Sequence, residues 1–326
     1  MLGGIKKFIK SSLLTPEHPF LWRLESRRLL AKMERNSRMS YAGIESVIGN
    51  FYRKIFGRTL NWENPQTFNE KIHVAALYMP DPIKTKLADK VAVREWITER
   101  IGSEYLIPLL GVYDSFDEID FDALPDSFVI KCSHDCGSVT LVKDKSKIDR
   151  DFLQRKYDFL MRRNYAWHGW EIQYRDIPHK IMIEKYMGAS INDYKFLCFN
   201  ERPYYCWVDM DRFTNHTRNF YSLDWKRQPF SLLYPNNSKD ETCPEKFEEM
   251  KNIAETLCSD FPHVRVDLYF VDGHIYFGEM TFTSEGGSGK MTPDEYDYTL
   301  GELWPFDSTI RAKVLAKFSR PLDYNP

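Results

Sequence analysis

Val264-Arg-Val-Asp-Leu-Tyr-Phe-Val-Asp-Gly-His-Ile-Tyr-Phe-Gly-Glu-Met-Thr-Phe282 carries the strongest structural signal in this sequence. Two strand-like runs flank the turn residues 272–274, which predicts a β-hairpin. A two-residue loop would put Asp267 and Glu279 on opposite faces, whereas a three-residue loop with a glycine bulge places them directly opposite each other. We expect the three-residue loop, because alternate residues from 264 to 270 then form one apolar face that fits a core.

The polar face of this hairpin is a candidate metal site. Facing carboxylates on neighbouring strands repel each other unless a cation lies between them. Mg²⁺ prefers carboxylate oxygens together with substrate phosphates, which suits Asp267 and Glu279. Arg265, which this register places opposite Thr281, offers an alternative, since its guanidinium group could pair with both acids.

A second candidate site lies in the segment from Phe128 to Val142. The pattern predicts a strand that ends at Lys131, a loop of small residues from His134 to Ser138, and a returning strand. The lysine supplies a point charge, and the loop N–H groups and the Ser138 hydroxyl supply donors, so the loop could cradle a phosphate. Many hairpins contain lysine and glycine, so this motif alone is weak.

The remaining pattern predicts an α+β architecture. Helical periodicity dominates to about residue 103, with a capping box formed by Thr67 and Glu70. Short strands then dominate to residue 282, and two helices interrupt them, near 149–164 and 244–259. We also expect a short helix and tail after residue 306.

Composition narrows the function classes. The chain has 326 residues, 43% of them apolar, and a formal net charge of −2 with acids and bases interspersed. That balance argues against nucleic acid as a partner, because phosphate binding needs a clustered positive field. No apolar run approaches the roughly 18 residues of a membrane span, and no signal peptide is evident, which predicts a cytoplasmic protein with free cysteines.

The first 40 residues are basic. Apolar residues at Leu2, Ile5 and Ile9 fall at helical spacing among lysines. This pattern is compatible with peripheral contact with an anionic membrane on the inner face of the cell membrane. An ordinary helix with a solvated charged face is the explanation that the pattern favours.

Taken as an ordered set, these segments resemble the TupA-like (teichuronopeptide-biosynthesis) branch of the ATP-grasp ligases. The similarity covers about residues 50–302 and rests on the blocks LNWENPQTFNEKI, LADKVAVREWI, SFVIKCSHDCGSV, DYKFLCFN, HTRNFY and VRVDLYFVDGHIYFGEMTFT. The resemblance implies an ATP-grasp fold, in which two α+β lobes clasp ATP. The expected organisation is a helical region at 1–85, a first lobe with the phosphate loop at 86–187, a second lobe with the metal site at 188–305, and a C-terminal helix and tail at 306–326.

The resemblance also implies roles for individual residues. On the nucleotide side, Lys131 would contact the phosphates, the loop with His134, Gly137 and Ser138 would close over the γ-phosphate, Lys90 and Lys195 would be further lysines, and Glu184, Lys185, Tyr186 and Met187 would form the adenine hinge. On the metal side, Asp267, Glu279 and Thr281 would hold Mg²⁺. On the substrate side, Arg265, Arg218 and Arg212 would stabilise an acyl phosphate or bind an acidic substrate.

One position departs from the wider family. Thr281 stands where Asn is usual, and this weaker ligand puts a second metal ion in doubt. The implied reaction is still an ATP- and Mg²⁺-dependent amide-forming ligation of a carboxylate to an amine, in the synthesis of a bacterial cell-surface polymer. An acidic sugar and an amino acid are the substrates that the resemblance suggests.

Three rival functions remain open at this point. Asp209-Met-Asp211 has the D-x-D form by which many glycosyltransferases chelate the metal of a nucleotide sugar, although no Gly-rich turn opens a βαβ unit near the N-terminus. A phosphotransferase could use the same ATP site to phosphorylate a sugar hydroxyl. A non-catalytic scaffold with a degenerate site is the third, and Thr281 is the residue that favours it.

Overall fold

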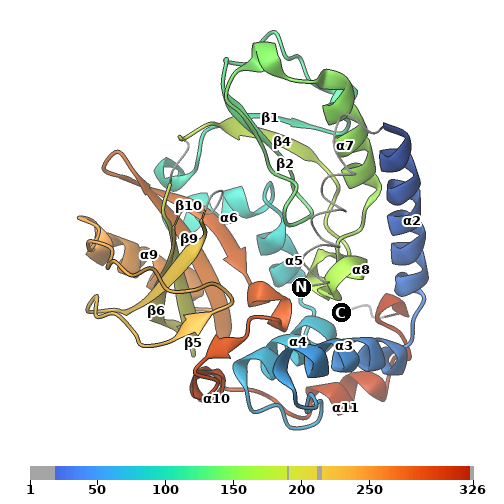
Figure 1. Ribbon diagram of the computed structural model, residues 1–326, viewed down its shortest axis with the longest axis vertical. Coiled ribbons are helices and arrows are strands. Elements are labelled where there is room, and N and C mark those ends of the chain that lie inside the picture. Colours follow the sequence, from blue (N-terminus) through green and yellow to red (C-terminus); the bar gives the residue numbers. More distant parts are fainter. Residues whose placement is uncertain (1–18, 189–190, 211–214, 324–326) are drawn as a thin grey trace.

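The structure is a computed structural model that describes residues 19–188, 191–210 and 215–323 (Figure 1). Predictions that concern the first 18 residues, Asp211 and Arg212 lie outside the described residues. The helices are α2 (Pro19–Ser37), α3 (Tyr41–Phe56), α4 (Phe68–Tyr78), α5 (Pro82–Ala88), α6 (Val93–Arg100), α7 (Arg150–Arg162), α8 (Ala166–Gly169), α9 (Phe247–Cys258), α10 (Glu295–Glu302) and α11 (Ile310–Leu315). Short 3-10 helices span Ser103–Tyr105, Phe116–Glu118, Lys145–Lys147, Ile172–Tyr174, Ser284–Gly287 and Pro321–Asp323.

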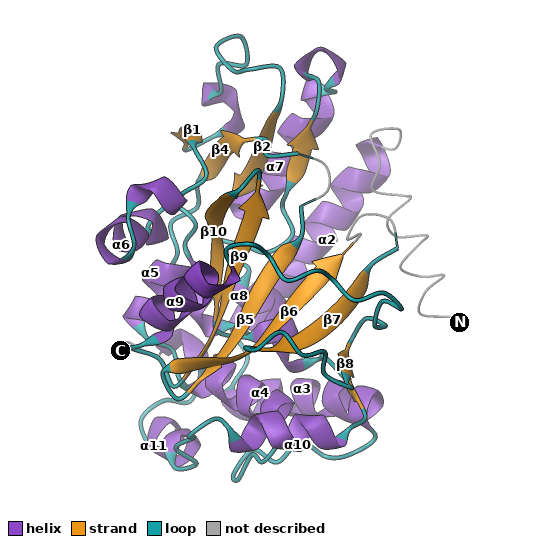
Figure 2. Cartoon of the chain, turned by 90° about the vertical axis from the view of Figure 1, so that its left-hand side faces the viewer, coloured by secondary structure: helices purple, strands orange, loops and turns teal. Residues whose placement is uncertain are grey.

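The first helices form a layer that supports the rest of the molecule. Helix α4 is buried along its whole length. The predicted capping box is confirmed: the Thr67 side chain accepts from the backbone N–H of Glu70, and the Glu70 carboxylate accepts from the backbone N–H of Thr67. Figure 2 shows α3, α4, α10 and α11 gathered at one end of the larger sheet.

The smaller sheet has four strands in the order β1-β4-β2-β3, all antiparallel. They are β1 (Leu109–Tyr113), β2 (Phe128–Cys132), β3 (Thr140–Val142) and β4 (Ile181–Lys185). Helix α7 packs on this sheet through Leu153, Tyr157 and Leu160, which share a core with Phe128 and Ile130. The sequence pattern did not predict β1.

The larger sheet has five strands in the order β10-β9-β5-β6-β7. They are β5 (Asp193–Phe199), β6 (Arg202–Met210), β7 (Thr217–Ser222), β9 (His263–Val271) and β10 (His274–Thr281). Two further short strands, β8 (Ser231–Leu232) and β11 (Met291–Thr292), pair with each other. One face of the larger sheet packs on α9, and the other face packs on α4 at one end and carries charged side chains at the other.

The β9–β10 hairpin confirms the predicted register by a different route. The turn has two residues, Asp272 and Gly273, both at positive φ (51° and 75°), so the predicted three-residue loop was wrong. A β-bulge at Gly278 inserts the extra residue instead, and it brings Asp267 opposite Glu279. A Cβ atom added at Gly278 would lie 3.0 Å from the Asp267 carbonyl oxygen, so the close strand approach favours glycine.

The two sheets fall within the predicted lobes 86–187 and 188–305. The limits of these lobes remain a prediction. Within residues 19–188, 191–210 and 215–323, no helix has the length and apolar character needed to cross a membrane.

Candidate active site

A pocket lies where the two sheets meet. Its walls come from the α5–α6 connection, from β2 and β4 of the smaller sheet, and from β10 of the larger one. Charged groups and apolar side chains share the lining: Leu87, Lys90, Val93, Arg94, Leu106, Lys131, Glu184, Phe277, Glu279 and Met280. The pocket is narrow. The pocket lies between Lys131, the predicted phosphate-loop lysine, and Glu279 of the predicted metal-binding hairpin.

Glu184 anchors the charged wall of this pocket. Its carboxylate accepts from Lys131 Nζ at 2.5 Å and from Arg94 Nη1 at 3.3 Å. The Arg94 guanidinium also donates to the Ile107 carbonyl at 2.9 Å. Two cations therefore flank one buried carboxylate, and Lys131 is held at the pocket in a defined position.

The predicted phosphate-binding residues in the loop after β2 differ in their exposure to solvent. Gly137, at φ 84°, is exposed. Ser138 is buried, and its hydroxyl oxygen accepts the N–H of Cys132 at 2.8 Å, which closes the base of the loop. Tyr157 of α7 donates to the Ser138 carbonyl at 3.0 Å. The exposed backbone around Gly137 is therefore the part of the loop that is open to a ligand, while Ser138 stabilises the loop.

His134 lies away from the pocket lining. Its ring is fully buried, stacks on His179 with ring centroids 3.8 Å apart, and has Nε2 3.1 Å from the Leu160 carbonyl. Burial lowers the pKa of His134 to about 4, so the ring is neutral at pH 7. This packing accounts for the histidine as part of the core, and the predicted nucleotide contact does not fit its position.

Lys90 links the helical wall to the loop. Its backbone N–H donates to the Ser133 carbonyl at 3.2 Å, and its Nζ donates to the Asp135 carbonyl. The side chain also lines the pocket. The structure therefore brings Lys90 and Lys131 to the same cavity, as the sequence analysis expected of two nucleotide-side lysines.

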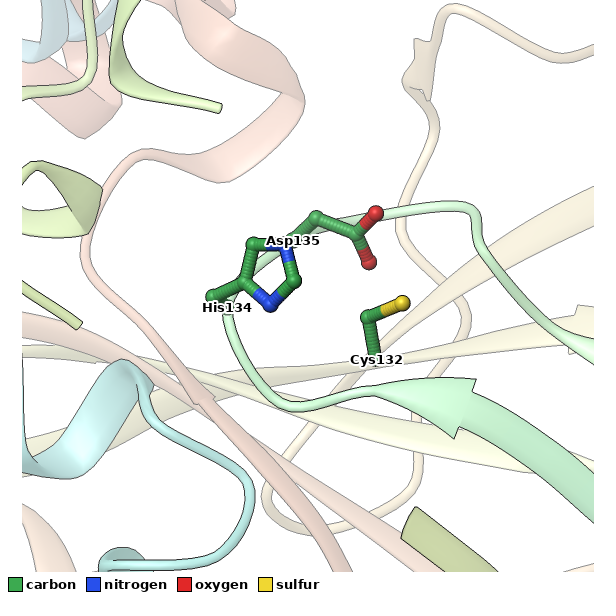
Figure 3. Close-up of side chains that lie close together, drawn as sticks. All are labelled: Cys132, His134 and Asp135. Carbon is green, nitrogen blue, oxygen red and sulfur yellow. The ribbon is translucent and has the colours of Figure 1, made fainter. Parts of the chain in front are cut away.

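Cys132, His134 and Asp135 form a compact buried cluster in the same loop (Figure 3). One ligand-type atom from each lies within 4.8 Å of the others. Cations surround the cluster, since Arg163 pairs with the Asp135 carboxylate and Lys90 binds the Asp135 carbonyl. Burial raises the pKa of Cys132 to about 12, so the thiol stays protonated. These surroundings oppose a divalent cation and fit an anion beside the loop.

The carboxylates of the β9–β10 hairpin are paired with an arginine of the same hairpin. Arg265 donates to both Asp267 carboxylate oxygens, at 2.6 and 2.7 Å, to Glu279 at 2.8 Å and to the Thr281 hydroxyl at 3.1 Å. The pairing alternative of the sequence analysis is therefore what this structure shows. Lys195 adds a second cation, 2.5 Å from Asp267.

The charge of this cluster still fits a metal ion. Lys195 also contacts Asp193 at 2.7 Å, so three carboxylates face two cations. Burial would raise the pKa of Glu279, but Arg265 and Lys195 hold it at about 2, so the carboxylate is ionised at pH 7. Two carboxylates and the Thr281 hydroxyl are hard oxygen donors of the kind that Mg²⁺ selects. Asp267, Glu279 and Thr281 are thus the residues that would hold it.

A second buried ion pair lies further along the polar face of the larger sheet. Arg218 donates to both oxygens of Asp209, at 2.5 and 3.1 Å, and contacts Glu285 at 2.9 Å. Its guanidinium carbon lies 4.5 Å from the centroid of the Trp207 ring, and that of Arg265 lies 5.2 Å from the same ring. Trp207 therefore connects two of the predicted substrate-side arginines.

The predicted hinge residues follow Glu184 at the end of β4. Lys185 is exposed and its backbone N–H donates to the Pro108 carbonyl at 3.0 Å. Tyr186 and Met187 are half-buried. Binding of an adenine base by the backbone of this segment stays a prediction.

Comparison with known proteins gives the family. The family described as TupA-like ATPgrasp matches residues 70–304, which is more than half of the chain. The chain belongs to this family. The predicted ATP-grasp fold and TupA-like resemblance are confirmed, and membership agrees with the predicted enzyme class, an ATP-dependent ligase. A search of curated proteins gave no match.

Solved structures of ATP-grasp enzymes are more distantly similar. D-alanine–D-alanine ligase from Bacillus anthracis is 17% identical, with 60% of this chain and 57% of that chain covered and a TM-score of 0.36. The Helicobacter pylori enzyme of the same name is 12% identical, with coverages of 71% and 62% and a TM-score of 0.37. N5-carboxyaminoimidazole synthetase from Staphylococcus aureus complexed with ADP is 11% identical, with coverages of 60% and 44% and a TM-score of 0.34. The chain spans less than two thirds of each of them.

Two residues of this ATP-grasp site escaped the sequence analysis. Arg94 had a usable signal, because it is a cation close in sequence to Lys90, and both line the same pocket. Glu171 had none. It is a buried carboxyl that accepts the Thr283 hydroxyl, and burial raises its pKa to about 7, with a further contribution from the negative charge of Glu279.

Proposed function

We propose that this TupA-like ATP-grasp protein is an ATP- and Mg²⁺-dependent ligase that joins a carboxylate to an amine through an acyl phosphate. Its place would be the cytoplasm, in the synthesis of a cell-surface polysaccharide or teichuronopeptide-type polymer. The observation that carries the proposal is one pocket that has Lys90, Lys131 and Arg94 on one wall and Glu279 on the other. Cations for phosphates and carboxylates for a metal ion thus face each other.

The chain's own residues would divide the work by position. Lys131 and Lys90 would contact the nucleotide phosphates as point charges, and the exposed backbone at Gly137 would add N–H donors. Apolar side chains at Leu87 and Met280 offer a surface for the base. Mg²⁺, when bound, would neutralise charge on the transferring phosphoryl group. Because such catalysis is positioning and electrostatics, no protein nucleophile is required.

The acid-binding side of the reaction falls to the buried arginines. Arg265 already binds carboxylates at the hairpin, and Arg218 binds two others close to Trp207. A guanidinium group that is already positioned by packing suits planar, bidentate recognition of a carboxylate or acyl phosphate. Both arginines would exchange a side-chain carboxylate for a substrate oxyanion. An acidic sugar is the substrate class that we propose for this position.

The test traps the activated acid. The protein is incubated with Mg·ATP, hydroxylamine and a panel of carboxylates that includes uronic acids and amino acids, and both ADP and hydroxamate are measured. Hydroxamate formation that requires ATP and one class of carboxylate supports the ligase. ADP release with a neutral sugar, and without hydroxamate, would transfer the proposal to a sugar phosphotransferase.

The glycosyltransferase alternative depends on Asp209. In this structure the carboxylate is committed to Arg218 and also lies 3.0 Å from His216 Nε2. Burial would raise the pKa of Asp209, but Arg218 keeps it well below its usual range. Asp267 is paired with Arg265 and Lys195 in a comparable way, so ion pairing alone does not separate the two acids. The ligase is favoured because Asp209 does not line the pocket that holds Lys90, Lys131 and Glu279, and because the chain matches the TupA-like ATP-grasp family.

A further inference from the structure

A groove runs between α2 and α7, away from the ATP-grasp pocket. Figure 1 shows the two helices beside each other along one edge of the molecule. Four arginines line the groove: Arg23 and Arg27 from α2, and Arg155 and Arg162 from α7. The groove continues past Arg27 and Arg162 toward Trp167.

Positive charge exceeds negative charge in this groove. None of its four arginines forms an ion pair with any residue in the part of the chain that the structure describes. Two carboxylates also line the groove: Glu34 pairs with Arg38, whereas Asp158 accepts from the neutral Gln154 and keeps its negative charge. Arg155 Nε is buried and has no hydrogen-bond partner among the described residues. Four arginines without an ion-pair partner in one groove favour an external anion.

Apolar rings lie beneath these charges. Trp22 packs edge-to-face on Phe152 and Phe159 of α7, with centroids 5.6 and 6.1 Å apart. Leu30 lines both ends of the groove. Alternation of arginine with indole and leucine is the composition of a surface that contacts headgroups and the upper part of the acyl chains.

The chain that leads into α2 has the same character. Residues 1–16 contain Lys6, Lys7 and Lys10 and no acidic residue, together with leucine, isoleucine and phenylalanine side chains. A basic, apolar segment therefore precedes a basic, partly apolar groove. Because the four arginines of the groove come from two separate helices, their charge covers an area rather than a single point. An extended anionic surface matches that distribution better than a free anion does.

We propose that the α2–α7 groove docks this protein on an anionic phospholipid membrane, with Arg23, Arg27, Arg155 and Arg162 contacting lipid phosphates. The inference goes beyond the ligase activity and does not depend on it.

Co-sedimentation of the full-length chain with vesicles tests the proposal. Vesicles of phosphatidylcholine with 30% phosphatidylglycerol should bind the protein at low salt, and pure phosphatidylcholine vesicles should not. Each arginine should contribute about fivefold to the partition coefficient, because a basic side chain near such a surface contributes on the order of 1 kcal/mol. The triple variant Arg27→Gln, Arg155→Gln, Arg162→Gln should therefore bind about 100-fold more weakly.

A matched control removes equal charge elsewhere. Arg202→Gln, Lys226→Gln, Lys239→Gln lies on the exposed surface of the second lobe and should keep most of the binding. Arg23→Gln, Arg27→Gln involves only exposed side chains, and it serves as the second variant if the triple variant does not fold. Equal losses in groove and control variants, or wild-type binding by the groove variants, would overturn the proposal. Saturable binding of inorganic phosphate without vesicle binding would also overturn it, by assigning the groove to a soluble anion.

Discussion

Glu171→Gln should make the stability of this protein less dependent on pH. Burial, with the nearby charge of Glu279, raises the pKa of Glu171 from 4.5 to about 7 in the fold. The folded state therefore binds the proton more tightly than the unfolded chain does. Ionising this carboxyl destabilises the fold, so its contribution to stability falls as the pH rises from about 4.5 to 7.

The magnitude follows from the two pKa values. With an unfolded value of 4.5 and a folded value of about 7, the contribution changes by roughly 2–3 kcal/mol between pH 5 and pH 8. Glutamine keeps the size of the side chain and a carbonyl oxygen that can still accept the Thr283 hydroxyl. The variant should therefore gain roughly 2–3 kcal/mol relative to the wild type over that interval.

Urea denaturation at pH 5, 6, 7 and 8 measures the difference. Asp307→Asn is the control, because Lys313 and Thr309 lower the pKa of this exposed carboxyl to about 2. Both of its pKa values lie below the interval, so its difference from the wild type should stay constant. A constant difference for Glu171→Gln as well would refute the reasoning that the carboxyl is buried without compensation.

Three further substitutions test the site and its support. Lys131→Met should weaken binding of Mg·ATP by about tenfold to 100-fold, because a charge-assisted contact contributes about 1.5–3 kcal/mol. Calorimetry measures the affinity, and the control variant Arg202→Met should bind Mg·ATP as tightly as the wild type. Thr67→Ala should lower the free energy of unfolding by about 1 kcal/mol in urea, because it removes an N-cap, and Thr67→Ser should restore it. Arg218→Met should lower it by about 3–5 kcal/mol, because Asp209 would be left buried without its main partner; a loss below 1 kcal/mol in the same assay would contradict that account.

The pairing of the carboxylates in the β9–β10 hairpin could be predicted from the sequence. Its two faces differ sharply in polarity, so a one-residue slip would have moved charged side chains into the apolar core against α9 and moved Val264, Val266 and Leu268 to the charged face. The turn could not be predicted, because Asp272-Gly273 supports a two-residue loop equally well. The bulge at Gly278 restores the pairing that the shorter turn would have shifted. The bulge could not be predicted, because glycine has no side chain to contribute to a hydrophobic pattern.

The electrostatic partners of the site depend on distant segments. Arg94 and Lys131 meet at Glu184, which lies 90 residues from Arg94 along the chain. The Glu171–Thr283 contact spans 112 residues. Sequence spacing predicted the residue types of the site, whereas its ion pairs depend on how the two sheets pack against each other. His134 illustrates this dependence, because the resemblance assigned it to the loop over the γ-phosphate, whereas in the fold its ring is buried against His179.

The most direct test of the central claim is calorimetric titration of the protein with Mg·ATP, with UDP-sugars as competing ligands. Glu279→Gln is the informative variant, because Arg265 keeps its two bonds to Asp267 when the glutamate is replaced. We predict that the wild type binds Mg·ATP, that UDP-sugars do not compete, and that the variant loses the Mg²⁺-dependent part of the affinity. Tight UDP-sugar binding with no Mg·ATP binding, or equal Mg·ATP affinity in the variant, would contradict a metal–nucleotide site between the two sheets.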